Sequence, residues 1–372
     1  MPAPLLFSPI AFGPLTLPNR IMVSPMCQYS AVDGHPVAWH LMHLGSLAMS
    51  GAGLLCVEAT AVRPEGRITP ACLGLYSDAH QASLQGVVDA LRTTSAMPLA
   101  IQLSHAGRKA SSRAPWEGGR LIPPEAGGWQ PIGPSAIAQR PEEPPPHAMD
   151  EDDLHQVVTS FADATRRARE IGFDAIELHM AHGYLLHQFL SPLANERTDA
   201  YGGSLANRMR MPLQVFEAVV ASAGPGVPVG VRLSATDWVE GGWDIAQTIA
   251  FARELEARGC AFVDISSGGV SHRQAIPSGP GYQVPFAAQV RREVRVPVVT
   301  VGLITQPAQA EQILAGGQAD VVALARGFLH DPRWPWRAAA DLGGRVTAPN
   351  PLLRATPAGH PAIFGEVRIG QR

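Results

Sequence analysis

Short apolar runs that are rich in β-branched residues recur along the 372-residue chain. A strand that is buried on both faces of a parallel sheet forms a continuous apolar segment of this kind. Eight such runs are present, at 20–24, 53–58, 98–103, 173–179, 227–233, 261–266, 296–301 and 320–324. Stretches with helical periodicity separate them, so the pattern predicts strands and helices in alternation.

The segment 151–171 shows the helical period most clearly. Its apolar residues, from Leu154 to Ile171, recur at steps of three and four and would lie on one face of a helix. Asp150 is a candidate N-cap, and Gly172 stands where a left-handed residue would end the helix. Helical segments at 245–258 and 306–315 are likewise followed by glycine and then by an apolar run.

Eight strands that alternate with helices are typical of a closed (β/α)8 barrel, whereas open doubly wound sheets usually have fewer strands. We therefore predict a TIM barrel that forms one domain over residues 1–354. Residues 5–17 predict a hairpin that closes the N-terminal bottom of the barrel. The Gly- and Pro-rich segment 104–149 follows the third strand and is long enough to be a functional lid. Residues 355–372 are expected to form an exposed or disordered C-terminal extension.

The charge balance and the cysteines narrow the classes of partner. Lys and Arg number 29 against 32 Asp and Glu, a net charge of −3, so we expect a small-molecule partner and neither nucleic acid nor a membrane. The four cysteines, at 27, 56, 72 and 260, show no CxxC or zinc-ligand spacing, which argues against a disulfide framework or an iron–sulfur site. No apolar run approaches the length of a membrane span, and we expect a cytoplasmic protein.

The active site of such a barrel lies at the C-terminal ends of the strands, so the residues that follow each run are candidates. These positions are mostly polar: residues 24–29, 59–60, Gln102, 104–105, 179–184, Arg232, 266–269, Gly302 and 325–327. Their convergence on one face is difficult to explain by packing. His179 and His182 could in principle bind a metal, but no third ligand stands at a suitable spacing, so no metal is expected.

One long motif carries a resemblance to a known family. Residues 179–192 read His-Met-Ala-His-Gly-Tyr-Leu-Leu-His-Gln-Phe-Leu-Ser-Pro, and residues 195–204 read Asn-Glu-Arg-Thr-Asp-Ala-Tyr-Gly-Gly-Ser. With these motifs the chain resembles the Old Yellow Enzyme family of flavin-dependent ene-reductases over residues 4–354. The segment 24–29, with Cys27 after Met26, resembles the bacterial subclass related to xenobiotic reductases.

The resemblance implies tightly bound, non-covalent FMN and assigns residues to it. Arg232 would stand beside N1 and C2=O, where reduced flavin carries negative charge, and a cation there raises the redox potential. Gln102 would bind the pyrimidine edge, and Cys27 would lie near C4=O and N5 and tune the potential. The remaining contacts would come from Ser24, Pro25, Met26 and Ala59 around the ring, and from Gly302, Ala325 and Arg326 at the phosphate.

The resemblance also implies a ping-pong reaction with NADPH or NADH as the reductant. His179 and His182 would donate hydrogen bonds to the substrate carbonyl while hydride from flavin N5 adds to the β-carbon of an activated alkene. Tyr184 would give a proton to the α-carbon. The expected substrates are enones, enals, maleimides and nitro compounds, with Tyr29 and Lys109 at the rim of their site.

The subclass implies a homodimer or homotetramer in which an arginine near the C-terminus enters the neighbouring site. Arg354 stands at that position, although Leu352 replaces the usual tyrosine two residues earlier. Three alternatives compete with this interpretation. The dienoyl-CoA reductase or amine dehydrogenase branch would require a longer chain with clustered cysteines, and the others are a flavin- or phosphate-binding sensor and a flavin-free aldolase-type barrel.

Overall fold

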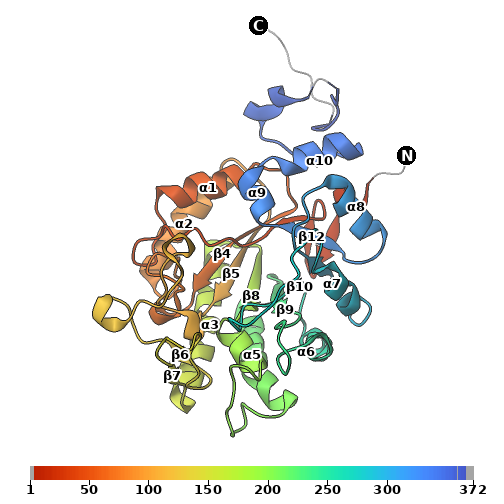
Figure 1. The fold of residues 1–372 in the computed structure, drawn as a ribbon. Helices are drawn as coiled ribbons and strands as arrows, with labels where there is room; N and C mark the ends of the chain where they lie inside the picture. The colour runs from red at the N-terminus through yellow and green to blue at the C-terminus, as the bar shows by residue number, and fades with distance from the viewer. Residues whose placement is uncertain (1–3, 358, 366–372) are drawn as a thin grey trace.

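Eight parallel strands form a closed barrel with helices around it (Figure 1) in the computed structural model, which describes residues 4–357 and 359–365. The strands are β3 Ile21–Val23, β4 Leu54–Ala61, β5 Leu99–Ser104, β8 Ala175–Met180, β9 Val229–Ser234, β10 Val263–Ser266, β11 Val298–Thr300 and β12 Val321–Leu324. They follow one another around the barrel in chain order, and β12 closes it by pairing with β3. The predicted (β/α)8 barrel is confirmed, with one strand in each apolar run.

Helices connect the strands: α1 Ala38–Ala48, α2 Asp78–Arg92, α3 Glu151–Ile171, α4 Leu185–Leu190, α5 Leu205–Ala223, α6 Ile245–Ala257, α7 Val284–Arg291, α8 Pro307–Ala315, α9 Arg326–His330 and α10 Trp334–Leu342. The predicted helix at 151–171 is confirmed. The Asp150 carboxylate accepts a hydrogen bond of 2.9 Å from the Asp153 amide, and Gly172 ends the helix at φ +93°. Its apolar face, which includes Leu154 and Phe161, is buried.

A hairpin closes the N-terminal end of the barrel, as predicted. Strands β1 Ile10–Phe12 and β2 Leu15–Leu17 pair antiparallel. Phe12 stacks on Phe262, the residue before β10, with 4.2 Å between ring centroids. Both rings are fully buried, and burial of each contributes about 1.5–3 kcal/mol to stability. The bottom of the barrel is therefore an apolar floor.

The character of the barrel interior changes from this floor toward the C-terminal ends of the strands. Residues that point inward lie two apart along each strand, because side chains alternate. The inward positions near the floor are apolar, such as Ala100 and Ala175, whereas Gln102 and Glu177 occupy the next inward positions. Both polar side chains are buried. The strands thus place polar groups inside the barrel directly below the end where a site is expected.

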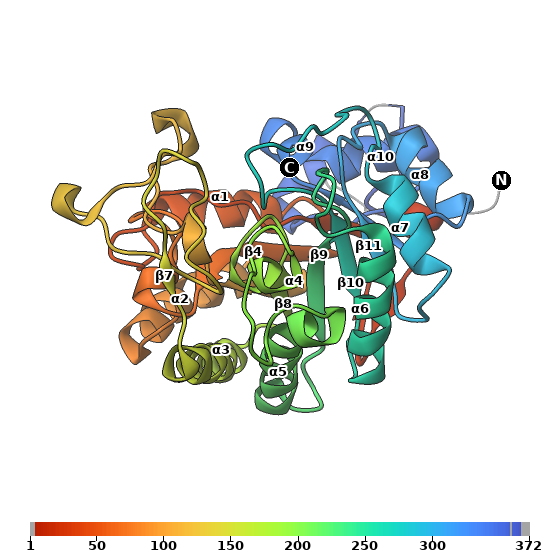
Figure 2. The ribbon, with the colours of Figure 1, turned by 60° about the horizontal axis from the view of Figure 1, so that its bottom comes forward.

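The segment 104–149 contains only short elements: η3 Gly107–Lys109, η4 Pro115–Glu117, η5 Pro124–Ala126, β6 Ile132–Gly133 and β7 His147–Ala148. Figure 2 shows it as the amber and yellow segment that extends away from the barrel. Arg108 ties its root to the rest of the protein by donating to the carbonyl oxygens of Ile137 and Val270. Its function as a lid remains a prediction.

Part of the C-terminal extension is folded against the barrel. Ile363 is buried against Val346 and Ala339, and the Phe364 ring meets Trp336 of α10 edge to face. The expectation of an exposed or disordered segment is therefore wrong for these two residues, because their apolar side chains pack on α10. Residues 366–372 lie outside the described part. Within residues 4–357 and 359–365, no helix has the length and apolarity to cross a membrane.

Candidate active site

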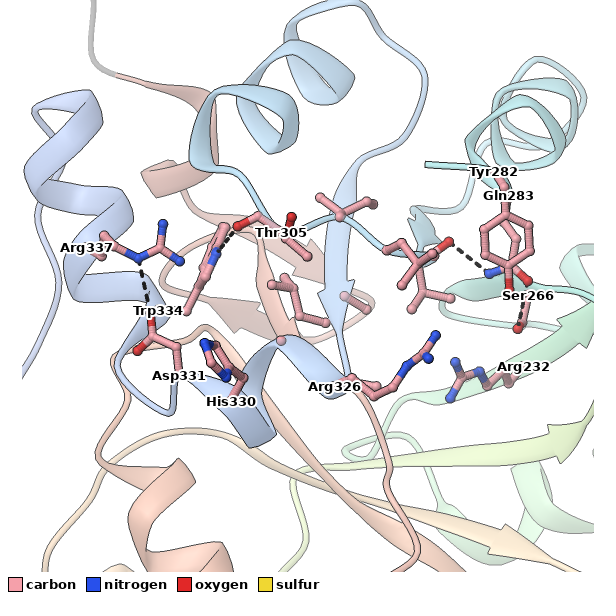
Figure 3. A pocket seen from close by; sticks show the side chains of 18 residues that line it. Arg232, Ser266, Tyr282, Gln283, Thr305, Arg326, His330, Asp331, Trp334 and Arg337 are labelled. Atoms are coloured by element: carbon pink, nitrogen blue, oxygen red, sulfur yellow. Dashed lines mark hydrogen bonds and ion pairs between the residues drawn. The ribbon is translucent and has the colours of Figure 1, made fainter. Parts of the chain in front are cut away.

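A cavity of about 340 Å³ opens at the C-terminal ends of the strands (Figure 3). Six residues that the sequence singled out line it together: Arg232, Ser266, Gly302, Ala325, Arg326 and Gly327. Tyr282, Gln283 and Trp334 also line it, and no sequence motif pointed to them. Tyr282 and Gln283 lie in the loop between β10 and α7, and Trp334 is the first residue of α10.

Two guanidinium groups face the same region of this cavity, as Figure 3 shows for Arg232 and Arg326. Arg232 is buried, and its Nε lies 3.1 Å from Oδ2 of Asp264. Among the described residues, neither guanidinium donates a hydrogen bond with good geometry to a protein acceptor. Two cations with free donors in one cavity suit a ligand that carries negative charge.

The absence of a side chain at Gly302 lets Gln283 and Tyr282 pack closely on the backbone in the wall of this cavity. Gly302 has φ +129°, and a Cβ there would lie 3.0 Å from Nε2 of Gln283 and 3.1 Å from the Tyr282 ring. The Gln283 side chain is fixed because it donates to the Val301 carbonyl and accepts from Ser267. This wall of the cavity is therefore narrow and well ordered.

His179 is the second-last residue of β8, and His182 lies in the loop that follows. Nδ1 of His182 is 3.3 Å from Nε2 of His179, and Nε2 of His182 is 2.7 Å from the Ser266 hydroxyl. Burial, followed by the positive charge of Arg232, holds the pKa of both imidazoles well below the usual value. Both rings are therefore neutral at pH 7, and each carries one N–H group without a net charge.

Tyr184 lies beside this pair. Its ring meets the His179 ring edge to face, with centroids 4.8 Å apart. Burial is the main reason that the pKa of the Tyr184 phenol is raised well above 10, so the hydroxyl keeps its proton at neutral pH. Within the described residues, that hydroxyl has no protein hydrogen-bond partner, which leaves it available to a ligand.

Lys109 connects the lid to the loop that carries His182. Its Nζ donates to the His182 carbonyl at 2.7 Å and to the Gly269 carbonyl at 3.0 Å, and it lies 4.9 Å from the centre of the Tyr184 ring. Burial and the nearby arginines lower the pKa of Lys109 to about 8. The residue predicted at the rim thus ties together the loops after β5, β8 and β10.

The segment 24–29 is held by a buried carboxylate that the sequence analysis missed. Oε2 of Glu58 accepts a hydrogen bond of 3.0 Å from the Gln28 amide, and Oε1 lies 3.5 Å from Nε2 of His40. Burial raises the pKa of Cys27 well above the ordinary value, so Cys27 is a thiol. Tyr29 adopts φ +49° and packs edge to face on Trp116 of the lid.

The other cysteines behave as expected. Cys56, Cys72 and Cys260 are buried, and burial raises the pKa of each thiol. They are ordinary core thiols.

Gln102 has its amide nitrogen occupied, because Nε2 donates to Oε1 of Glu177 at 2.7 Å. Glu177 and Asp264 are functional-site neighbours that sequence reasoning also missed. A charged residue inside an apolar run was the available signal for both. Arg354 lies exposed in η6 Asn350–Ala355 and is not among the residues that line the cavity.

The residues present fit FMN. The paired cavity cations suit a phosphate and the charged pyrimidine of reduced flavin, and Gly302 lines the same cavity. A TIM barrel with this site at its C-terminal end defines the class of flavin-dependent barrel oxidoreductases.

Comparison with known proteins identifies the family. The model of the NADH:flavin oxidoreductase / NADH oxidase family matches residues 5–343, so the chain belongs to this family. An NADPH dehydrogenase from Geobacillus thermodenitrificans is 42% identical over 347 residues, which cover 93% of this chain and 96% of that protein. The predicted family resemblance is thereby confirmed.

Two solved structures agree with this assignment. Morphinone reductase in complex with tetrahydroNAD matches with a TM-score of 0.74 and 31% identity, over 94% of this chain and 93% of that one. An old yellow enzyme homologue from Zymomonas mobilis matches with a TM-score of 0.74 and 27% identity, over 93% and 94%. The chain is an NAD(P)H-dependent flavin oxidoreductase with FMN as its flavin, which excludes the sensor and the flavin-free aldolase.

Proposed function

We propose that this oxidoreductase is an ene-reductase, which reduces the carbon–carbon double bond of enones, enals, maleimides and nitroalkenes. The observation that carries the proposal is the grouping of two neutral imidazoles with a protonated phenol, His179, His182 and Tyr184. FMN bound here would supply the hydride chemistry that carries reducing equivalents from NAD(P)H to the β-carbon of the alkene. Arg232, Gln102, Cys27, Ser24, Pro25, Met26, Ala59, Gly302, Ala325 and Arg326 would hold it.

The two imidazoles would bind the carbonyl oxygen of the substrate. Nδ1 of His179 accepts from the Ala181 amide at 3.3 Å, so its ring proton is on Nε2, which donates to Nδ1 of His182. The proton of His182 is then on Nε2, which donates to the Ser266 hydroxyl, and a bound carbonyl oxygen would replace these two acceptors. A neutral N–H donor withdraws electron density from the alkene and stabilises the enolate charge that develops at the oxygen. Loss of one such donor typically slows a reaction by about 10²–10³.

Tyr184 would supply the proton that completes the reduction. Its raised pKa keeps the phenol protonated, and Lys109 above its ring stabilises the phenolate that forms as the proton leaves for the α-carbon. Water then returns a proton to the phenolate. Hydride and proton together account for the two hydrogens that the alkene gains.

The test is steady-state and anaerobic single-turnover kinetics with NADPH and 2-cyclohexenone, with chromatographic detection of the saturated ketone. We expect ketone formation in proportion to NADPH consumed, and a loss of at least about 10² in the alkene half-reaction for His182→Ala. His155→Ala, at an exposed position on α3, is the matched control and should react like the wild type. Rapid flavin reduction by NADPH without any ketone product would refute the ene-reductase proposal and leave the family assignment intact.

We also propose that the enzyme is a homodimer or homotetramer in which Arg354 reaches the substrate site of a neighbouring subunit. The exposed position of Arg354 in the short helix η6 supports this proposal. Light scattering would give the oligomeric state. Arg354→Ala should raise the KM for the alkene several-fold, and an unchanged KM in an oligomeric enzyme would refute the shared site.

A further inference from the structure

Below the cavity, the barrel interior holds two buried carboxyl groups and one guanidinium. Glu177 on β8 and Asp264 on β10 have no exposed surface, and Arg232 lies on the strand between them. Arg232 pairs in register with Asp264 on one side and with His179 on the other. Since Glu177 is two residues before His179, its side chain points inward one layer deeper.

These three side chains leave a charge imbalance. Oε2 of Glu177 and both carboxylate oxygens of Asp264 lack a hydrogen bond of good geometry, although Oδ2 of Asp264 lies 3.1 Å from Nε of Arg232. Gln102 donates to the other oxygen of Glu177 but is uncharged. Two carboxylates against one cation would leave a net negative charge in a low-dielectric interior, which is costly.

No other group that faces the cluster removes this imbalance. Among the described residues, Arg326 faces Arg232 from the cavity but forms no ion pair with Glu177 or Asp264. Inside the barrel, the remaining titratable neighbours are Cys56 on β4 and His179 on β8. Burial keeps the thiol protonated and the imidazole neutral, so neither carries charge. The charge imbalance is therefore removed only if one of the two carboxyl groups is protonated.

We propose that Glu177 and Asp264 share a single proton, so that their cluster with Arg232 is electrically neutral. This neutrality determines the net charge beside the flavin at Arg232. Burial, with the negative charge of Asp264, raises the pKa of Glu177 to about 8 and agrees with a protonated Glu177 at neutral pH. Asp264 then forms the ion pair with Arg232. The inference rests on FMN as the cofactor.

A shared proton has a consequence that a fixed charge does not have. If Asp264 is replaced by Asn, Glu177 can ionise in its place, and if Glu177 is replaced by Gln, Asp264 remains ionised. Each single variant therefore keeps the cluster neutral. The double variant Glu177→Gln/Asp264→Asn cannot compensate, and Arg232 is left with an unbalanced positive charge.

The experiment measures the midpoint potential of bound FMN at pH 7 by anaerobic dye equilibration in the wild type, both single variants and the double variant. The potential reports the ratio of affinities for reduced and oxidised flavin. We expect less than about threefold change in that ratio for each single variant. For the double variant we expect at least about tenfold in favour of reduced flavin, because an uncompensated unit charge contributes about 1.4 kcal/mol even roughly 12 Å away at an effective dielectric constant of about 20.

If each single variant shifted the midpoint potential equally and the two shifts added up in the double variant, both carboxylates would be ionised in the wild type. This outcome would refute the shared proton. An unchanged double variant would refute the influence on the flavin. Infrared spectroscopy keeps the proposal testable if the double variant does not fold. The wild type should show the C=O stretch of a buried carboxylic acid that Glu177→Gln lacks, and its absence from the wild type would also overturn the proposal. A protein that binds no FMN would instead contradict the cofactor assignment.

Discussion

Replacement of Tyr184 by Phe removes one oxygen atom from the site and little else. The ring contacts with His179 and Lys109 do not involve the hydroxyl, so the Phe ring can keep both. Within the described residues, the hydroxyl has no protein partner, and its loss leaves no buried donor or acceptor unsatisfied. The free energy of unfolding should therefore change by less than about 1 kcal/mol.

The effect on catalysis should be much larger. A positioned general acid typically contributes about 10²–10⁴ to the rate, and we expect the alkene half-reaction of Tyr184→Phe to slow by that factor. Reduction of FMN by NADPH requires no proton from the phenol and should stay within about twofold of the wild type. Because the pKa of Tyr184 is raised well above 10, the wild-type rate should show no break from this group up to pH 9.

Anaerobic stopped-flow spectroscopy separates the two half-reactions by following flavin absorbance, first with NADPH and then with cyclohexenone. Tyr201→Phe is a suitable control because Tyr201 lies away from the cavity, between α3 and α5. Equal losses in both half-reactions of Tyr184→Phe would show a general disturbance of the site and refute the proton-donor role. An unchanged alkene half-reaction would show that another group supplies the proton.

Three further predictions concern the residues around this site. Replacement of His179 and His182 by Ala should abolish the charge-transfer absorbance of bound phenols, and unchanged phenol affinity and colour would place the oxyanion site elsewhere. Gly183→Ala should lower the midpoint temperature of thermal unfolding far more than Gly203→Ala. Both glycines have positive φ, but only a Cβ at Gly183 would clash, because it would lie 2.2 Å from a backbone oxygen of the loop after β10. Equal decreases in the midpoint temperature would contradict this prediction. Burial lowers the pKa of His105 to about 4, so between pH 6.5 and about 4 this residue binds more protons in the unfolded chain than in the folded protein. The free energy of unfolding should therefore fall by up to about 1.4 kcal/mol for each unit by which the pH decreases in this range. A denaturant titration series should show a weaker pH dependence for His105→Asn, and an identical slope would refute that assignment.

The fold could be predicted from the sequence because its determinants are local. Each barrel strand is a short apolar run, and α3 has both its N-cap Asp150 and its terminating Gly172 in the sequence. The packing of Ile363 on α10 could not be predicted in this way. It depends on contacts with Ala339, Val346 and Phe7, and an isolated pair of apolar residues shows no periodicity that would indicate those contacts.

The candidate site was predictable where residues follow the strand ends, as for Arg232, His179 and Arg326. It was not predictable where function depends on the barrel interior. Glu177 and Asp264 stand in runs that were interpreted as buried strands, and only the closed barrel brings these two carboxyl groups to the same guanidinium. Strand order and register determine which charged side chains become neighbours. The sequence of a single strand does not contain that information.

The stacked rings of Phe12 and Phe262 close one end of the barrel, so molecules that react in its interior enter and leave through the opposite opening. Nicotinamide and alkene would then compete for one entrance. At high alkene concentration, the alkene would occupy the oxidised enzyme and delay its next reduction. A plot of turnover rate against alkene concentration should rise, pass through a maximum and decline, and the position of that maximum should move upward as more NADPH is supplied.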